Sequence, residues 1–360
     1  MLIAVLAAAA LAGACDLEAP SGEAGCTREA VDRLKLNDIQ AVGTHNSYKL
    51  AISPAQMKLV RAADPQQADA LDYAHRPLAA QLDAGARQLE LDLLNDPEGG
   101  RYASPLAMKV ANDQPYDLEP LKAPGLKVMH AQDIDYRSTC PRFTTCLEEV
   151  RAWSKAYPDH LPLLILLNLK EGGLTLPGAT LALPFDGAAM DRVDAEIRSI
   201  FRDAELITPD QVQGRRRTLR EAVLAGGWPT LKTARGKVMF ALDAPEDQVA
   251  LYRGARRSLE GRVMFVNIDE SSPAAAYITL NEPKAQAGRI AAAVKAGLLV
   301  RTRADADTAE ARADDRSRQA AAFASGAQYV STDYMQPDPR LGPYETRLPG
   351  GGVARRNPVR

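Results

Sequence analysis

The chain has 360 residues, a formal net charge of −2, and 46% hydrophobic and 25% charged residues. This is the composition of a globular protein, with enough length for one large domain or two ordinary ones. The nearly neutral charge excludes a bulk attraction to nucleic acid or to an anionic membrane, so any membrane contact would be local and transient. We expect no nucleic-acid partner, and we expect a monomer.

The first segment, residues 1–14, is almost wholly apolar and ends in Ala12-Gly13-Ala14 before Cys15. It is too short to cross a bilayer, so it predicts a signal peptide and a secreted or periplasmic protein. Ala-Gly-Ala-Cys also fits a bacterial lipoprotein cleavage site, with Cys15 as the lipid-bearing residue, although Ala12 stands where leucine is preferred. Both alternatives, a soluble exported protein and one anchored through Cys15, stay open.

Export would permit disulfides. Cys140 and Cys146 are separated by a short segment and are expected to form one. Cys15 and Cys26 would close a second loop if Cys15 carries no lipid; otherwise Cys26 has no evident partner. The cysteine spacing does not favour a zinc site, because the histidines are far away in the sequence.

Strands alternate with helices between residues 27 and 345, which we assign to a single domain followed by a C-terminal tail at 346–360. Short apolar runs predict parallel, buried strands at 39–42, 88–92, 126–130, 163–169, 237–242, 263–268, 298–301 and 328–331. Two long insertions, 95–125 and 172–191, follow strands that carry polar residues.

Alternating strands and helices imply a parallel sheet, and this number of strands fits a (β/α)8 TIM barrel. A doubly wound open sheet is the alternative. The barrel is favoured because polar residues follow at least four strands, and a barrel brings all these strand ends to one mouth. Both insertions would then lie over that mouth.

Carboxylates concentrate at two expected strands. Glu90 and Asp92 are two residues apart and share one face of a strand. Burying two like charges is costly unless a cation neutralises them. With the amide oxygen of Asn46 and the carboxylate of Glu171 they supply four oxygen donors, a set that suits Ca²⁺ or Mg²⁺ rather than zinc. The alternative is neutralisation by an ion pair with Arg87, Lys170 or another base.

Two histidines stand at the ends of expected strands. His45 follows the first strand and His130 ends the third, so both would face the mouth, where general acid and base roles are available to them. His75 and His160 lie in sequence contexts typical of ordinary loops.

Further polar residues would meet the substrate. Arg301 and Arg303 share a face, which suits a phosphate or vicinal hydroxyls; an ion pair with Asp305 or Asp307 is the alternative.

Past the last strand, Asp333 would bind a hydroxyl, and Tyr334 would either stack on a sugar ring or pack at the barrel lip. Lys170 is also expected to contact the substrate.

The set His45-Asn46, Glu90-x-Asp92, His130 and Glu171 resembles the catalytic core of the calcium-dependent phosphatidylinositol-specific phospholipases C. Longer strings resemble the bacterial secreted branch of that family: Gly-Thr-His-Asn-Ser-Tyr at 43–48, Trp-Pro-Thr-Leu at 228–231, Arg-Gly-Lys at 235–237, Val-Arg-Thr-Arg-Ala-Asp-Ala-Asp at 300–307 and Ser-Thr-Asp-Tyr at 331–334. The resemblance extends over about residues 36–334.

The resemblance implies a barrel that binds Ca²⁺ through Asn46, Glu90, Asp92 and Glu171, with Mg²⁺ as the alternative cation. It also implies a phospholipid substrate. The inositol 2-hydroxyl would attack phosphorus, diacylglycerol would leave, and a cyclic inositol phosphate would form and then be open to hydrolysis. We assign His130 as the acid and place His45 beside the metal and phosphate; the reverse assignment stays open.

Two other functions are considered. Glycerophosphodiester phosphodiesterases resemble this chain in their histidines, Glu-x-Asp pair, divalent cation and barrel, but they are expected to have His-Arg where this chain has His45-Asn46. A non-catalytic barrel that binds lipid or sugar would have lost a histidine or a ligand, and none is missing.

Overall fold

Strands and helices alternate along the chain in a computed structural model that describes residues 15–111 and 116–360. The strands are β1 (Ile39–Thr44), β2 (Gln88–Leu94), β3 (Lys127–Val128), β4 (Leu163–Lys170), β5 (Val238–Leu242), β6 (Met264–Val266), β7 (Tyr277–Thr279), β8 (Leu299–Arg303), β9 (Tyr329–Thr332) and β10 (Ala354–Arg356).

The α-helices are α1 (Arg28–Asp32), α2 (Pro54–Ala63), α3 (Pro65–Ala70), α4 (Leu78–Asp83), α5 (Leu106–Ala111), α6 (Phe143–Ala156), α7 (Gly187–Ile200), α8 (Pro209–Gln213), α9 (Leu219–Leu224), α10 (Leu231–Ala234), α11 (Glu246–Arg253), α12 (Ala287–Ala296), α13 (Ala309–Ala313) and α14 (Ser317–Ala324). Single 3-10 turns lie at Leu36–Asp38, Glu119–Lys122 and Asp203–Glu205.

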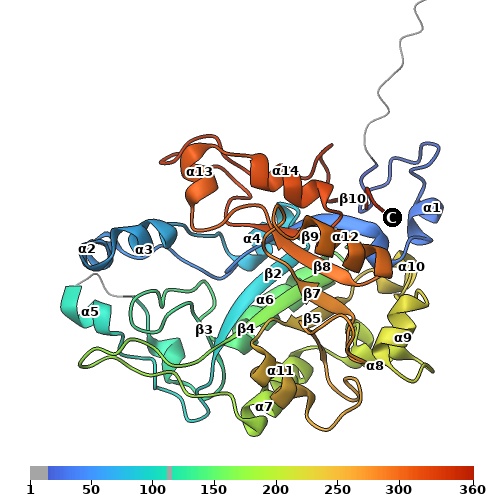
Figure 1. Cartoon of the computed structure of the whole chain (residues 1–360). Coiled ribbons are helices and arrows are strands. Elements are labelled where there is room, and N and C mark those ends of the chain that lie inside the picture. Colours follow the sequence, from blue (N-terminus) through green and yellow to red (C-terminus); the bar gives the residue numbers. More distant parts are fainter. Residues whose placement is uncertain (1–14, 112–115) are drawn as a thin grey trace, which may run out of the picture.

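Eight strands form a parallel barrel in the order β6-β5-β4-β2-β1-β9-β8-β7 (Figure 1). An isolated parallel bridge between Asn267 and Tyr277 joins the two ends of this series, β6 and β7. The expected (β/α)8 barrel is therefore confirmed. All positions of β1, β2 and β5 are buried, as expected for strands with the barrel interior on one face and helices on the other.

One predicted barrel strand is wrong. Within 126–130 only β3 is a strand, and it pairs antiparallel with the end of β2, outside the barrel. The eighth parallel strand is β7, which the sequence analysis missed because three residues give too short an apolar run. The 126–130 run is apolar for another reason: Leu126 and Val128 are buried in the main core, and Met129 is buried in a smaller cluster with residues of the two insertions.

The described parts of the two insertions contact each other at the carboxyl end of the barrel. A bridge joins Asn95 to Leu183, and a second bridge, between Gly172 and Ala182, closes the second insertion on itself. Helices α2, α3 and α5 lie together at the same end, on the left in Figure 1. The insertions and these helices build a rim on one side of the mouth.

Both ends of the described chain pack against β1 or its neighbours. Within the expected tail, β10 pairs antiparallel with β1. The buried Leu17 donates its N–H to the carbonyl of Ala354 at 2.9 Å. Disulfides join Cys15 to Cys26 and Cys140 to Cys146. The predicted signal peptide, 1–14, lies outside the described residues, and within them no helix has the length and apolarity to cross a membrane.

Candidate active site

His45 follows β1 and forms a pair with Asp333, which follows β9. The two strands are neighbours, and the Nδ1 of His45 lies 2.8 Å from the Oδ1 of Asp333. The Nε2 of His45 lies 3.8 Å from the Oε1 of Glu90 and 3.5 Å from Nη1 of Arg303. Burial, reinforced by the positive charge of Arg303, holds the pKa of His45 well below its ordinary value. At neutral pH the ring is therefore uncharged, and with its proton on Nδ1 it presents a basic Nε2 to the mouth.

His130 forms the second histidine–aspartate pair. The pairing of β3 with β2 places it beside Asp92, whose carbonyl accepts the N–H of Met129 at 3.3 Å. The Nδ1 of His130 lies 3.0 Å from the Oδ2 of Asp135, and the other carboxylate oxygen lies 3.3 Å from the Nζ of the fully buried Lys49. Burial raises the pKa of Asp135, but Lys49 and His130 outweigh it, so the net shift is downward and Asp135 is ionised.

Glu90 and Asp92 project from β2 into the barrel mouth and share one amide. The Nδ2 of Asn168, on β4, donates to Glu90 Oε1 at 2.7 Å and to Asp92 Oδ1 at 3.1 Å. Each carboxylate also has a cationic partner: Lys170 Nζ lies 2.9 Å from Asp92 Oδ2, and Arg301 pairs closely with Glu90. Ion pairing, the alternative considered from the sequence, is thus present, with Lys170 as expected and with Arg301 in place of Arg87.

The second arginine supports His45. Arg303 Nη2 lies 3.0 Å from Asp333 Oδ2, so this guanidinium binds the carboxylate oxygen that His45 leaves free. The N–H of Asp333 donates to Oδ1 of Asp305 at 2.8 Å. Burial, with the nearby charge of Asp333, raises the pKa of Asp305 to about 7, and Arg303 acts against that rise.

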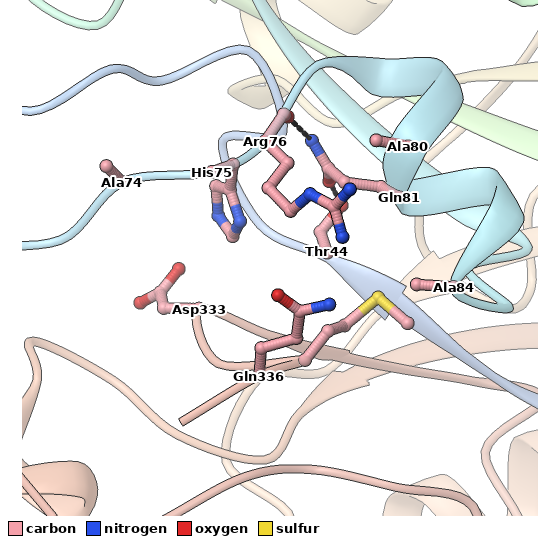
Figure 2. Close-up of a pocket in the computed structure, with 10 residues that line it drawn as sticks. Thr44, Ala74, His75, Arg76, Ala80, Gln81, Ala84, Asp333 and Gln336 are labelled. Carbon is pink, nitrogen blue, oxygen red and sulfur yellow. Dashed lines mark hydrogen bonds between the residues drawn. The ribbon is translucent and has the colours of Figure 1, made fainter. Parts of the chain in front are cut away.

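A small pocket lies behind this arrangement, lined by His75, Arg76, Gln81, Asp333 and Gln336 among others (Figure 2). His75 lies with its Nε2 2.8 Å from the carbonyl oxygen of His45. The sequence analysis had treated His75 as an ordinary loop residue, but it contacts the backbone of a candidate catalytic residue.

The model of the Ca²⁺-dependent phosphoinositide phospholipase C family matches residues 34–358, almost the whole described chain. The chain belongs to this family. The enzyme class expected from the sequence, a phosphoric diester hydrolase, is confirmed by this membership. The family is Ca²⁺-dependent, and the match gives no support to the Mg²⁺ alternative.

Solved structures of low sequence identity share the fold. A calcium-dependent phosphoinositol-specific phospholipase C from a Pseudomonas species, in its apo form, is 17% identical with a TM-score of 0.56, covering 90% of this chain and 95% of that one. Its myo-inositol complex is 16% identical with a TM-score of 0.54, covering 90% of this chain and 96% of that one. A Ca²⁺-dependent enzyme from Streptomyces antibioticus is 22% identical with a TM-score of 0.52, covering 83% and 95%. No curated protein matches the chain.

Two other predicted residues, Glu171 and Tyr334, make contacts outside this constellation. Glu171 is exposed, and its Oε1 accepts the N–H of Phe185 at 2.6 Å. Within 15–111 and 116–360, no three His, Cys, Asp or Glu side chains are grouped to hold a metal ion. Tyr334 is buried and packs edge-on against Tyr344, the barrel-lip alternative.

Sequence reasoning missed Asn168, Asp135, Lys49 and Tyr73. Asn168 had a signal, because it is a lone amide in an otherwise apolar strand run, two residues before Lys170. Asp135 had a weaker one, an acidic residue five positions after a candidate catalytic histidine. Tyr73 accepts a hydrogen bond from Asn46 at 2.8 Å, and no pattern in the sequence connects these two residues.

Proposed function

We propose that the enzyme cleaves phosphatidylinositol into diacylglycerol and a cyclic inositol phosphate. The observation that carries the proposal is the pair of His–Asp couples on either side of Glu90 and Asp92, in a member of this phospholipase family. A phosphodiester transfer needs one group to accept a proton and another to donate one.

In the first part of the reaction, the Nε2 of His45 accepts the proton of the inositol 2-hydroxyl while its oxygen bonds to phosphorus. Asp333 supports this step, because its carboxylate fixes the proton on Nδ1 and stabilises the positive ring that results. Arg303 and Arg301 lie beside His45 and Glu90, where they stabilise negative charge that develops on the phosphoryl oxygens.

In the second part, the bond between phosphorus and the glycerol oxygen breaks and His130 protonates that oxygen. The ionised Asp135 at Nδ1 holds the ring in place and compensates its charge before the proton is transferred. Water can then attack the cyclic product by the reverse use of the two histidines.

The donors at the mouth fit calcium in type, because Glu90, Asp92, Asn46 and Asn168 all offer oxygen. Asn46 uses its nitrogen on Tyr73, which leaves Oδ1 for a cation, and it holds a left-handed backbone (φ 46°) that aspartate and asparagine tolerate best. We propose these four residues as the calcium ligands, with Asn168 in place of Glu171. When bound, calcium neutralises phosphoryl charge and acidifies the attacking hydroxyl.

We also propose export. Two disulfides suit an oxidising compartment. The sulfur of Cys15 is bonded to Cys26, and one sulfur cannot carry both a disulfide and a lipid thioether, which supports the soluble alternative over the lipid anchor.

The test measures release of inositol phosphates from phosphatidylinositol and of glycerol phosphate and inositol from glycerophosphoinositol, with calcium and with a chelator. We expect calcium-dependent cleavage of phosphatidylinositol that is lost in both His45→Ala and His130→Ala. Release of glycerol phosphate and inositol from glycerophosphoinositol alone would favour the glycerophosphodiesterase, and no turnover of either substrate would favour a binding protein.

A further inference from the structure

Lys49 is a fully buried lysine whose charge lies beside the aspartate of the second histidine couple. Its Nζ donates to the carbonyl oxygens of Leu71 and Tyr73, each at 3.0 Å, and more weakly to that of Leu50 at 3.4 Å. The same atom lies 3.3 Å from Oδ1 of Asp135, which is equally shielded from solvent. A buried ammonium group needs such partners, and they fix the charge of Lys49 in one place next to the carboxylate.

The backbone around Lys49 is also joined to the loop that carries Asp135. An antiparallel bridge pairs Lys49 with Ser138, three residues after Asp135. The N–H of Leu50 donates to the carbonyl oxygen of Arg137 at 3.2 Å. The segment that follows β1 is therefore tied to the segment that follows β3, and the lysine reaches the carboxylate from a fixed backbone position.

The charge of Lys49 acts on the state of that carboxylate. Burial alone would raise the pKa of Asp135, and among the single influences that lower this pKa the charge of Lys49 is the largest. An ionised Asp135, 3.0 Å from Nδ1 of His130, stabilises a positively charged ring, and a charged ring can give its other proton to a leaving oxygen. Without the lysine, a proton on the buried carboxyl group would be favoured over a proton on the ring, and a neutral ring is a much weaker acid.

We propose that Lys49 is a positioning residue for the general acid: it keeps Asp135 ionised and aimed at Nδ1 of His130, so that the ring can protonate the glycerol oxygen. The inference rests on the proposed function, in which His130 is that acid. Lys49 stands four residues after His45 in the sequence, yet its side chain contacts the partner of the other histidine. A lysine that only supports the fold would affect all substrates equally. A lysine that serves the acid matters only where the leaving oxygen needs a proton.

The test compares two inositol phosphodiesters that differ in their leaving groups. Short-chain phosphatidylinositol releases an alkoxide, which must be protonated, whereas nitrophenyl inositol phosphate releases a stable phenolate that needs no proton. Lys49→Met removes the charge and keeps most of the side-chain length. Lys127→Met is the matched control, because Lys127 is also fully buried and lies 3.0 Å from an aspartate outside the candidate site, Asp96. Like Lys49, it donates to two backbone carbonyl oxygens, those of Ala123 and Gly125.

In Lys49→Met we expect kcat for phosphatidylinositol to fall about 10- to 100-fold with little change in KM, while kcat for the nitrophenyl substrate stays within about threefold of wild type. In Lys127→Met we expect a lower melting temperature, and any loss of rate should be the same for both substrates. Equal losses on the two substrates in Lys49→Met, or full activity of this variant on phosphatidylinositol, would overturn the inference.

A second comparison covers the case in which Lys49→Met does not fold, since the loss of one partner leaves a buried charge uncompensated. Lys49→Met/Asp135→Asn removes both charges and is compared with Asp135→Asn alone. We expect the same kcat for phosphatidylinositol in both, because the lysine acts through the carboxylate. A further fall in the double variant would show that Lys49 acts by another route and would overturn the inference. If the wild-type enzyme turns over neither substrate, the proposed function itself fails, and the acid role on which the inference rests fails with it.

Discussion

Replacement of Asp333 by asparagine tests the basic role of His45 most sharply. Asp333 contacts His45 Nδ1 through one oxygen at 2.8 Å and Arg303 through the other at 3.0 Å. An asparagine of the same shape would turn its oxygen toward the guanidinium, because an amide NH₂ cannot accept a hydrogen bond from Arg303. Its NH₂ would then face Nδ1, and the ring proton would be forced onto Nε2, where the lone pair is needed.

The expected loss in kcat is about 10²–10⁴-fold, or roughly 3–5.5 kcal/mol of transition-state stabilisation, with little change in KM. Initial rates of inositol phosphate release give kcat and KM, and thermal melting confirms the fold. Asp269→Asn, an exposed aspartate outside the site, is the matched control and should retain full activity. An Asp333→Asn enzyme within about threefold of wild type would refute the base assignment.

Four further changes extend the test to the rest of the site and to the fold. His130→Ala should reduce turnover by about 10²–10⁴-fold while calcium affinity measured by calorimetry stays near normal; a fully active variant would remove it from the acid role. Lys170→Met should strengthen calcium binding in calorimetry, because the lysine neutralises a carboxylate that calcium needs, and weaker binding would contradict the proposed ligands. Arg303→Met should raise the pKa of His45 and move the acid limb of the kcat/KM profile to higher pH, because that guanidinium lowers the pKa; an unmoved limb would count against it. Reduction of the bond between Cys140 and Cys146 should cost about 2 kcal/mol and lower Tm by roughly 2–3 °C, and an unchanged Tm would show that the loop is held by other contacts.

The barrel was predictable because its strands are short apolar runs with polar residues at one end. The run at 126–130 misled for a physical reason: burial outside the barrel, in the main core and in the cluster beneath the insertions, demands the same residue types as burial in a barrel wall. In contrast, β7 has only three residues, Tyr277–Thr279, and all three pair with β8. No local sequence pattern indicates this pairing.

The residues of the candidate site likewise fall into those that the sequence pattern predicts and those that only the folded barrel brings together. Glu90, Asp92 and His45 were predictable, since alternation along a strand and position at a strand end decide where they point. His130 lies at the mouth for another reason than the one expected, because β3, which precedes it, pairs with the end of β2 outside the barrel. Their partners were not predictable. Arg301 lies on β8 and Glu90 lies on β2, and these strands are not neighbours in the barrel. Only the closed barrel brings the two side chains together. Glu171 stays a prediction: it is exposed and accepts the N–H of Phe185, a contact that no sequence pattern indicates.

The central claim is that two imidazoles at one barrel mouth transfer the phosphoryl group to the neighbouring inositol hydroxyl. Phosphorus NMR of phosphatidylinositol incubated with the wild-type enzyme and calcium tests it most directly. We predict that the resonance of a five-membered cyclic inositol phosphate appears first, before any monoester, and that it is absent for both His45→Ala and His130→Ala. Direct formation of the monoester with no cyclic intermediate, or of phosphatidic acid, would contradict it.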